Sequence, residues 1–141
     1  MYTYSFEKLE VWNESKEFTK TIYTITSTFP DQEKFGLISQ LRRAAVSICS
    51  NIAEGSARTT YKDKAHFTTM AFSSAIEVIN QLILCFEMNF ISEEVLKGSL
   101  TENTQYKLIA VDKEVKIETI ETIEEKPKRG RKKKGEGIGA L

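Results

Sequence analysis

The stretch that decides the fold is residues 42 to 55, Arg-Arg-Ala-Ala-Val-Ser-Ile-Cys-Ser-Asn-Ile-Ala-Glu-Gly. With the residues before it, this stretch predicts a helix whose buried stripe is Ile38, Leu41, Ala45, Ile48 and Ile52. A second, polar stripe lies beside it and consists of Gln40, Arg43, Ser47, Asn51 and Glu54. Short polar side chains between alanines allow another backbone to approach, so we expect this stripe to meet another helix or another copy of the chain. An ordinary exposed face is the alternative.

Apolar periodicity elsewhere predicts an all-α, up-and-down antiparallel four-helix bundle in residues 1–111, with helices at about 6–28, 32–54, 61–89 and 93–111. Pro30 ends the first helix, and Asp31 precedes the second. Gly55 is expected to take the left-handed conformation that ends the second helix. Thr60 and Asp63 have the spacing of a capping box for the third.

The fourth helix is the weak or atypical one. Ser92, followed by two glutamates, is a reasonable start, but Gly98 weakens the helix soon after it begins. Leu108, Val111 and Val115 supply only a poor apolar stripe, so a three-helix hairpin with a short fourth segment competes with a full bundle. Residues 112–141 are expected to form an acidic-then-basic tail, largely disordered, with 9 cationic and 7 acidic side chains.

Three parts of the chain carry a family resemblance. They are the stretch from Glu33 through Gly55, the opening Phe6-Glu7-Lys8-Leu9-Glu10-Val11-Trp12, and the pattern formed by Ser74, Glu77 and Gln81. Together they resemble the four-helix-bundle family named for proteins encoded in intervening sequences of the 23S ribosomal RNA.

That family includes the accessory variability determinant (Avd) of diversity-generating retroelements. The resemblance implies a ring-like homopentamer, structured RNA as a ligand and a reverse transcriptase as a partner. Two features depart from the family pattern: Cys49 stands where the family usually has Pro, and the fourth-helix sequence fades after about Leu100. The first puts the family's helix kink in doubt, and the second puts the fourth helix in doubt.

Composition sets the broad class of protein. A chain of 141 residues that is 40% hydrophobic suits one compact domain with a tail, and its net charge is zero. We find no apolar run long enough to cross a bilayer and no secretory signal, which predicts a cytoplasmic protein without a membrane role. Cys49 and Cys85 lie among apolar helical neighbours, so buried free thiols are expected, although a bridge stays open.

Polar residues also interrupt the apolar face of the third helix, at Ser74, Glu77 and Gln81. A buried carboxylate needs a partner, so we expect Glu77 to meet Arg42 or Arg43, within the protomer or across an oligomer interface. We interpret Gln40, Arg42, Arg43, Ser47, Asn51, Glu54, Glu77 and Gln81 as an oligomer or polar network. Direct contact with a ligand is the alternative.

The sequence favours a protein that is not an enzyme and that uses no metal and no cofactor. His66 is the only histidine, so two-histidine metal motifs are impossible. Cys49 or Ser50 with His66 would be the only nucleophile and base pair to consider, but a thiol in an apolar run stays protonated. Glu54 and Glu77 are a weak candidate for a carboxylate pair.

Two clusters predict nucleic-acid binding. Arg58, Lys62 and Lys64 gather near the start of the third helix, where cations and free amides meet phosphates. The tail adds a denser cluster of seven cations, Lys126, Lys128, Arg129, Arg131, Lys132, Lys133 and Lys134. A merely solubilising tail is the alternative. We therefore expect an oligomeric, non-catalytic bundle that binds structured RNA, with a purely structural homo-oligomeric scaffold as the rival.

Overall fold

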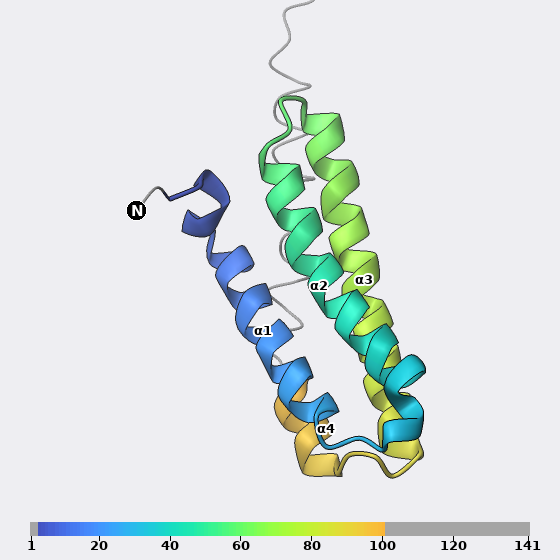
Figure 1. Ribbon diagram of the computed structural model, residues 1–141. Coiled ribbons are helices and arrows are strands. Elements are labelled where there is room, and N and C mark those ends of the chain that lie inside the picture. The colour runs from blue at the N-terminus through green and yellow to red at the C-terminus, as the bar shows by residue number, and fades with distance from the viewer. Residues whose placement is uncertain (1–2, 101–141) are drawn as a thin grey trace, which may run out of the picture.

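The computed structural model describes residues 3–100. Its elements are two 3-10 turns, η1 (Ser5–Lys8) and η2 (Asp31–Phe35), and four α-helices, α1 (Glu10–Thr26), α2 (Leu37–Ser56), α3 (Tyr61–Glu87) and α4 (Glu93–Ser99). Consecutive helices run in opposite directions (Figure 1). The predicted fold class, an all-α up-and-down bundle, is confirmed, and α4 is its short member.

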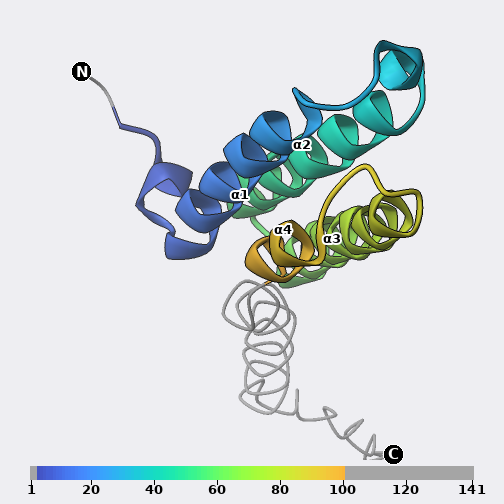
Figure 2. The same ribbon diagram turned by 90° about the horizontal axis from the view of Figure 1, so that it is seen from below.

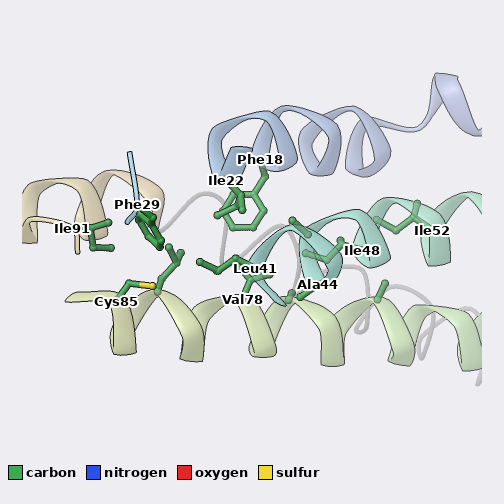
Figure 3. Close-up of a cluster of buried hydrophobic side chains, with 14 residues drawn as sticks. Phe18, Ile22, Phe29, Leu41, Ala44, Ile48, Ile52, Val78, Cys85 and Ile91 are labelled. Atoms are coloured by element: carbon green, nitrogen blue, oxygen red, sulfur yellow. The ribbon is translucent and has the colours of Figure 1, made fainter. Parts of the chain in front are cut away.

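The core lies between α1 and α2 on one side and α3 on the other, and α2 packs against both neighbours (Figure 2). Side chains from all three helices meet there, and Phe29 and Ile91 from the connections close one end (Figure 3). Seven side chains of the core have no accessible surface, namely Ile22, Leu41, Ala45, Ile48, Val78, Leu82 and Cys85. Their three- and four-residue spacing explains why sequence periodicity predicted these helices.

The first helix begins later than predicted. Ser5–Lys8 forms a 3-10 turn, in which a Glu7 carboxylate oxygen accepts from the Tyr4 backbone N–H at 2.8 Å. Leu9 is extended, and α1 starts at Glu10. The Asn13 side chain donates to the carbonyls of Glu7 and Leu9, which fixes the change of direction. The prediction of a helix from residue 6 is therefore wrong, because local side chains satisfy this backbone differently.

The second helix is also preceded by a separate turn rather than starting near residue 32. Pro30 leads into η2, and Gly36 separates that turn from α2. A Cβ at Gly36 would lie 2.5 Å from Oε2 of Glu33. That same oxygen accepts from the Leu37 N–H at 3.1 Å, so it caps the start of α2. Glycine leaves room for this cap.

Gly55 does not end α2, which continues to Ser56. No described glycine has a positive φ, so the predicted left-handed conformation is wrong. Gly55 is buried against α3, where an added Cβ would lie 3.0 Å from the Cβ of Phe67. This glycine therefore serves close packing of two helices instead of a turn. The helix also passes without interruption through Cys49, the position where the family usually has Pro.

The end of α3 uses the left-handed conformation that was expected elsewhere. Asn89 has φ 60°, and Phe90 N–H donates to the carbonyl of Cys85 at 2.8 Å, while Asn89 N–H donates to Phe86. This pair of bonds is a Schellman motif. Ser92 then caps α4 by accepting from the Val95 N–H. The predicted continuation of the fourth helix at residues 101–111, and the predicted tail at 112–141, lie outside the described residues.

α3 is apolar on two faces. One face packs on α2, and a second stripe with heptad spacing is partly exposed, with Ile76 and Ile83 48% and 44% accessible. We call this the outer stripe, and it consists of Phe72, Ile76, Ile79, Ile83 and Phe86. By length and composition, Tyr61–Glu87 is able to span a membrane, which corrects the prediction that no segment could. Such a helix is weak evidence alone, since core helices of soluble proteins meet the same criterion.

Both cysteines are free thiols, as predicted, but only Cys85 is buried as expected. Cys85 is fully buried, and burial, with a smaller contribution from the Glu33 charge, raises the pKa of its thiol to about 11. Cys49 is half-buried between α1 and α2, where its sulfur lies 3.2 Å from Oγ of Ser15 and 3.4 Å from Oγ1 of Thr19. These small polar contacts hold α1 and α2 close together.

Candidate functional site

Part of the predicted polar network lies between α2 and α3. The hydroxyls of Ser47 and Ser74 are 2.9 Å apart. Asn51 is buried and donates to the Ser47 carbonyl at 2.8 Å and to its hydroxyl at 3.1 Å. A short chain of hydrogen bonds thus joins the two helices inside one protomer. Its role in assembly stays a prediction.

A second polar group lies further along the same two helices. The Gln81 amide nitrogen donates to Glu77 at 3.1 Å and to Gln40 at 3.4 Å. Gln81 is buried, and its amide oxygen has no hydrogen-bond partner within residues 3–100. An unsatisfied buried carbonyl is unfavourable, so this network is the least satisfied polar part of the α2–α3 contact.

Neither arginine reaches Glu77 within the protomer. The Nε of Arg42 donates to Oγ1 of Thr26 at 2.8 Å, so its side chain points to α1 rather than to α3. Arg43 is exposed and forms no ion pair with any residue of the described range. The prediction of an intramolecular ion pair with Glu77 is therefore wrong. A pair across an oligomer interface stays a prediction.

The predicted basic cluster at the α2–α3 turn is partly neutralised by its own acids. Arg58 is ion-paired with Glu54, one helical turn before it, and its guanidinium lies 4.5 Å from the Phe67 ring centroid. Glu54 therefore belongs to this surface pair and not to the polar network. At the start of α3, Thr60 Oγ1 donates to Asp63 Oδ2 at 2.6 Å and accepts from the Asp63 backbone N–H at 3.1 Å.

Asp63 thus places a carboxylate where a phosphate would otherwise meet the free amides of α3. Lys62 is exposed, and Lys64 is half-buried with its Nζ 5.8 Å from the Tyr61 ring centroid. The turn keeps two lysines for a ligand, but its arginine and its helix start are occupied.

A different set of cations surrounds a groove of about 530 Å³ at the opposite end of α2. We call it the basic groove, and the side chains that define it are Tyr23, Lys34, Phe35, Ile38, Arg42 and Arg43. They come from the end of α1, from η2 and from the first half of α2. No carboxylate from the described residues lines it. None of the three cations of the basic groove, Lys34, Arg42 and Arg43, forms an ion pair with residues 3–100.

One arginine of the basic groove is held in a fixed orientation. The guanidinium of Arg42 lies 4.7 Å from the Tyr23 ring centroid while its Nε donates to Thr26. Its terminal nitrogens make no hydrogen bond with residues 3–100, and the side chain lines the groove. A guanidinium held in this way presents donors with a fork geometry that suits phosphate or carboxylate oxygens.

Sequence reasoning missed Tyr23, Lys34 and Phe35. Phe35 is 90% accessible, and the Nζ of Lys34 lies 5.9 Å from its ring centroid. The sequence signal for an exposed ring was the run Lys-Phe-Gly directly before α2. An aromatic residue in a turn has few apolar neighbours that could cover it. Its neighbours in space, Arg42 and Tyr23, follow only from the fold.

The described residues offer little for catalysis. Cys49 lies against Ser15 and Thr19, whereas His66 is exposed on the first turns of α3 with its ring 5.7 Å from that of Phe67. The nucleophile and base pair considered for these residues therefore has no geometric support. Within the described range, no three His, Cys, Asp or Glu side chains gather to hold a metal ion. The absence of enzymatic activity stays a prediction.

The seven cations of the predicted tail, from Lys126 to Lys134, lie outside the described residues. A comparison with curated proteins finds no match to the chain. The sequence does match the 23S rRNA-intervening sequence protein family over residues 7–111, about three quarters of its length. The match covers the described helical bundle from η1 to α4. The chain therefore belongs to the 23S rRNA-intervening sequence protein family.

Proposed function

We propose that this protein is a non-catalytic, self-associating helical bundle of the cytoplasm that binds nucleic acid, with structured RNA as its preferred ligand. The observation that carries the proposal is the basic groove, where Lys34, Arg42 and Arg43 come together and no described carboxylate lines the surface. Cations without acidic partners are attracted to phosphates, and each contact releases counterions from the nucleic acid. The cationic tail adds charge to the same protein.

Self-association is supported by the outer stripe of α3. Heptad spacing with partly exposed isoleucines is the pattern of a helix that packs against another helix. A homopentamer is the assembly that family membership suggests. We expect the double variant Ile76→Lys and Ile83→Lys to lower the mass measured by light scattering, since charges at such a contact are unfavourable. An unchanged mass would show that the outer stripe is not a contact between copies of the chain.

The experiment for nucleic-acid binding compares the full chain with a version ending at Glu125, after co-purified nucleic acid has been removed. Both are titrated with a structured RNA at several salt concentrations. We expect both to bind, with weaker binding and a smaller salt dependence for the shortened chain. Binding lost entirely on truncation would move the function to the tail. Absence of binding by either chain at low salt would favour the second candidate, a purely structural scaffold.

A finer role is accessory factor to the reverse transcriptase of a diversity-generating retroelement. It rests on kinship with the family to which the accessory variability determinant belongs. A reverse transcriptase encoded beside this protein, and recovered with it on affinity purification, would support the role. Recovery of the protein with RNA but without such an enzyme would restrict the function to RNA binding.

A further inference from the structure

The most exposed large apolar side chain of the described bundle lines the same groove as three cations that have no ion pair within residues 3–100. Phe35, 90% accessible, ends η2, and Arg42 and Arg43 follow on the first turns of α2. All three line the basic groove. An exposed phenyl ring contributes little to this core, so its face is available to a ligand that has a flat apolar surface as well as negative charge.

The other aromatic ring of the basic groove, that of Tyr23, already contacts the guanidinium of Arg42. Tyr23 is 44% accessible and has the Arg42 guanidinium 4.7 Å from its ring centroid. Thr26 holds the Nε of that guanidinium at 2.8 Å. The arrangement leaves a planar cation with both a stacking surface and unused N–H donors. Bases stack on aromatic rings and on guanidinium planes, and phosphates bind the donors.

We propose that the basic groove binds an unpaired stretch of nucleic acid, in which a base stacks on Phe35 and the adjoining phosphates contact Arg42 and Arg43. This inference rests on the proposed function and deepens it, because it assigns single strands to one site. A base-paired duplex would present its phosphates to the arginines but would keep its bases stacked on each other. Phe35 would then be unused.

The experiment uses the full chain with the seven tail cations from Lys126 to Lys134 changed to glutamine, which we call the tail-neutral chain. Without those charges, binding through the tail does not mask the groove. The probes are a fluorescent single-stranded oligouridine RNA of about 12 nucleotides and a duplex of the same length, followed by anisotropy. Phe35→Ala is expected to weaken single-strand binding about tenfold and to leave duplex binding unchanged. Phe35→Trp should restore it.

Tyr61→Ala provides the matched control, because Tyr61 is also an exposed aromatic residue beside lysines, at the α2–α3 turn. We expect it to leave both probes unaffected. Since Phe35 is nearly fully accessible, its substitution should also leave the melting temperature unchanged.

Three results would overturn the inference. If the tail-neutral chain binds the single strand and Phe35→Ala binds it equally well, the site is elsewhere while the proposed function stands. If Phe35→Ala lowers the mass of the assembly, the ring is covered by a second copy of the chain and not by a base. If the unmodified full chain binds neither probe at low salt, the proposed function itself fails and the inference fails with it.

Discussion

The two cationic ends of α2 look alike in composition and differ in their partners. At the α2–α3 turn, Arg58 is paired with Glu54, and Asp63 occupies the start of α3. In the basic groove, Arg42 is positioned by a neutral hydroxyl and Arg43 has no acid within the described bundle. The count of cations is the same at the two ends, three at each, whereas the pairing of charges favours the groove. A cluster of cations is therefore a candidate site only after its own carboxylates have been placed.

The largest expected effect is a loss of stability of the helical bundle, which contains both cationic regions. Leu41 is fully buried and lies one residue before Arg42. Leu41→Ala should lower the free energy of unfolding by about 2–5 kcal/mol, because it removes transfer free energy and leaves a cavity. Urea denaturation followed by circular dichroism measures it, with Ser50→Ala on the exposed side of α2 as control. A loss below about 0.5 kcal/mol would contradict the described core.

The next effect separates the two regions directly. Arg43→Ala should lower the slope of log binding constant against log salt concentration by about 1, the equivalent of one phosphate contact, because no acid competes for this side chain. Arg58→Ala should leave the slope almost unchanged, since Glu54 already neutralises that charge. Both are measured by anisotropy in the tail-neutral chain. Equal slopes for the two variants would remove the distinction between the regions.

A smaller effect tests the orientation of Arg42. Thr26→Val keeps the shape of a buried side chain but removes the oxygen that accepts from Nε. We expect a stability loss of about 1 kcal/mol and weaker single-strand binding, because the guanidinium is no longer held. The Thr26 hydroxyl also donates to the Ile22 carbonyl one turn earlier. Thr24→Val removes the same kind of bond, to the Lys20 carbonyl, at an exposed position, and should leave RNA binding intact. Loss of binding in both variants would indicate a general effect on α1.

The last turn of α3 contains Cys85, a buried thiol whose pKa is raised by the fold. Burial and the Glu33 charge raise the pKa of Cys85 from 9.0 to about 11, so the folded protein holds this proton more tightly than the unfolded chain. The contribution is fully present below pH 9.0 and is lost as the pH rises to about 11. Stability of the parent should fall across this window relative to Cys85→Ala. Parallel pH profiles for the two proteins would contradict the assigned burial.

The smallest expected effect comes from releasing Arg58. Glu54→Gln removes a half-exposed ion pair, so stability should change by less than about 0.5 kcal/mol. Binding of RNA should rise slightly as the arginine becomes available. Glu17→Gln, which removes an ion pair with Lys20 on exposed α1, should not change it. A clear loss of RNA binding in Glu54→Gln would mean that Glu54 itself contacts the ligand.

Sequence periodicity was sufficient for the helices and insufficient for their ends. Ile48 and Leu82 belong to rows of apolar residues at helical spacing. Such a row predicts a helix without knowledge of how the helices pack. Gly55 was misread because a glycine near a helix end has two uses, and only the proximity of Phe67 decides between them. The starts at residues 6 and 32 were misread because Glu7 and Glu33 bond to nearby backbone N–H groups and support 3-10 turns.

The candidate site was harder to predict than the fold. Arg42 and Arg43 were singled out, but their directions depend on Thr26 and Tyr23 of another helix. The run Lys-Phe-Gly signals an exposed aromatic ring at Phe35, but the place of that ring beside Arg42 and Tyr23 follows only from the tertiary arrangement. The sequence can thus indicate which residues belong to a candidate binding surface. Which of their charges are paired, and which side chains are exposed, depends on the tertiary structure.

The central claim is that nucleic acid contacts the basic groove. The most direct test is photo-crosslinking of the unmodified full chain to a single-stranded RNA containing 4-thiouridine, followed by mass spectrometry of the tryptic peptides. We predict adducts on the peptide that begins at Phe35 and ends at Arg42. Adducts confined to the peptide containing Tyr61, or to the tail, with the Phe35 peptide recovered unmodified, would contradict the claim.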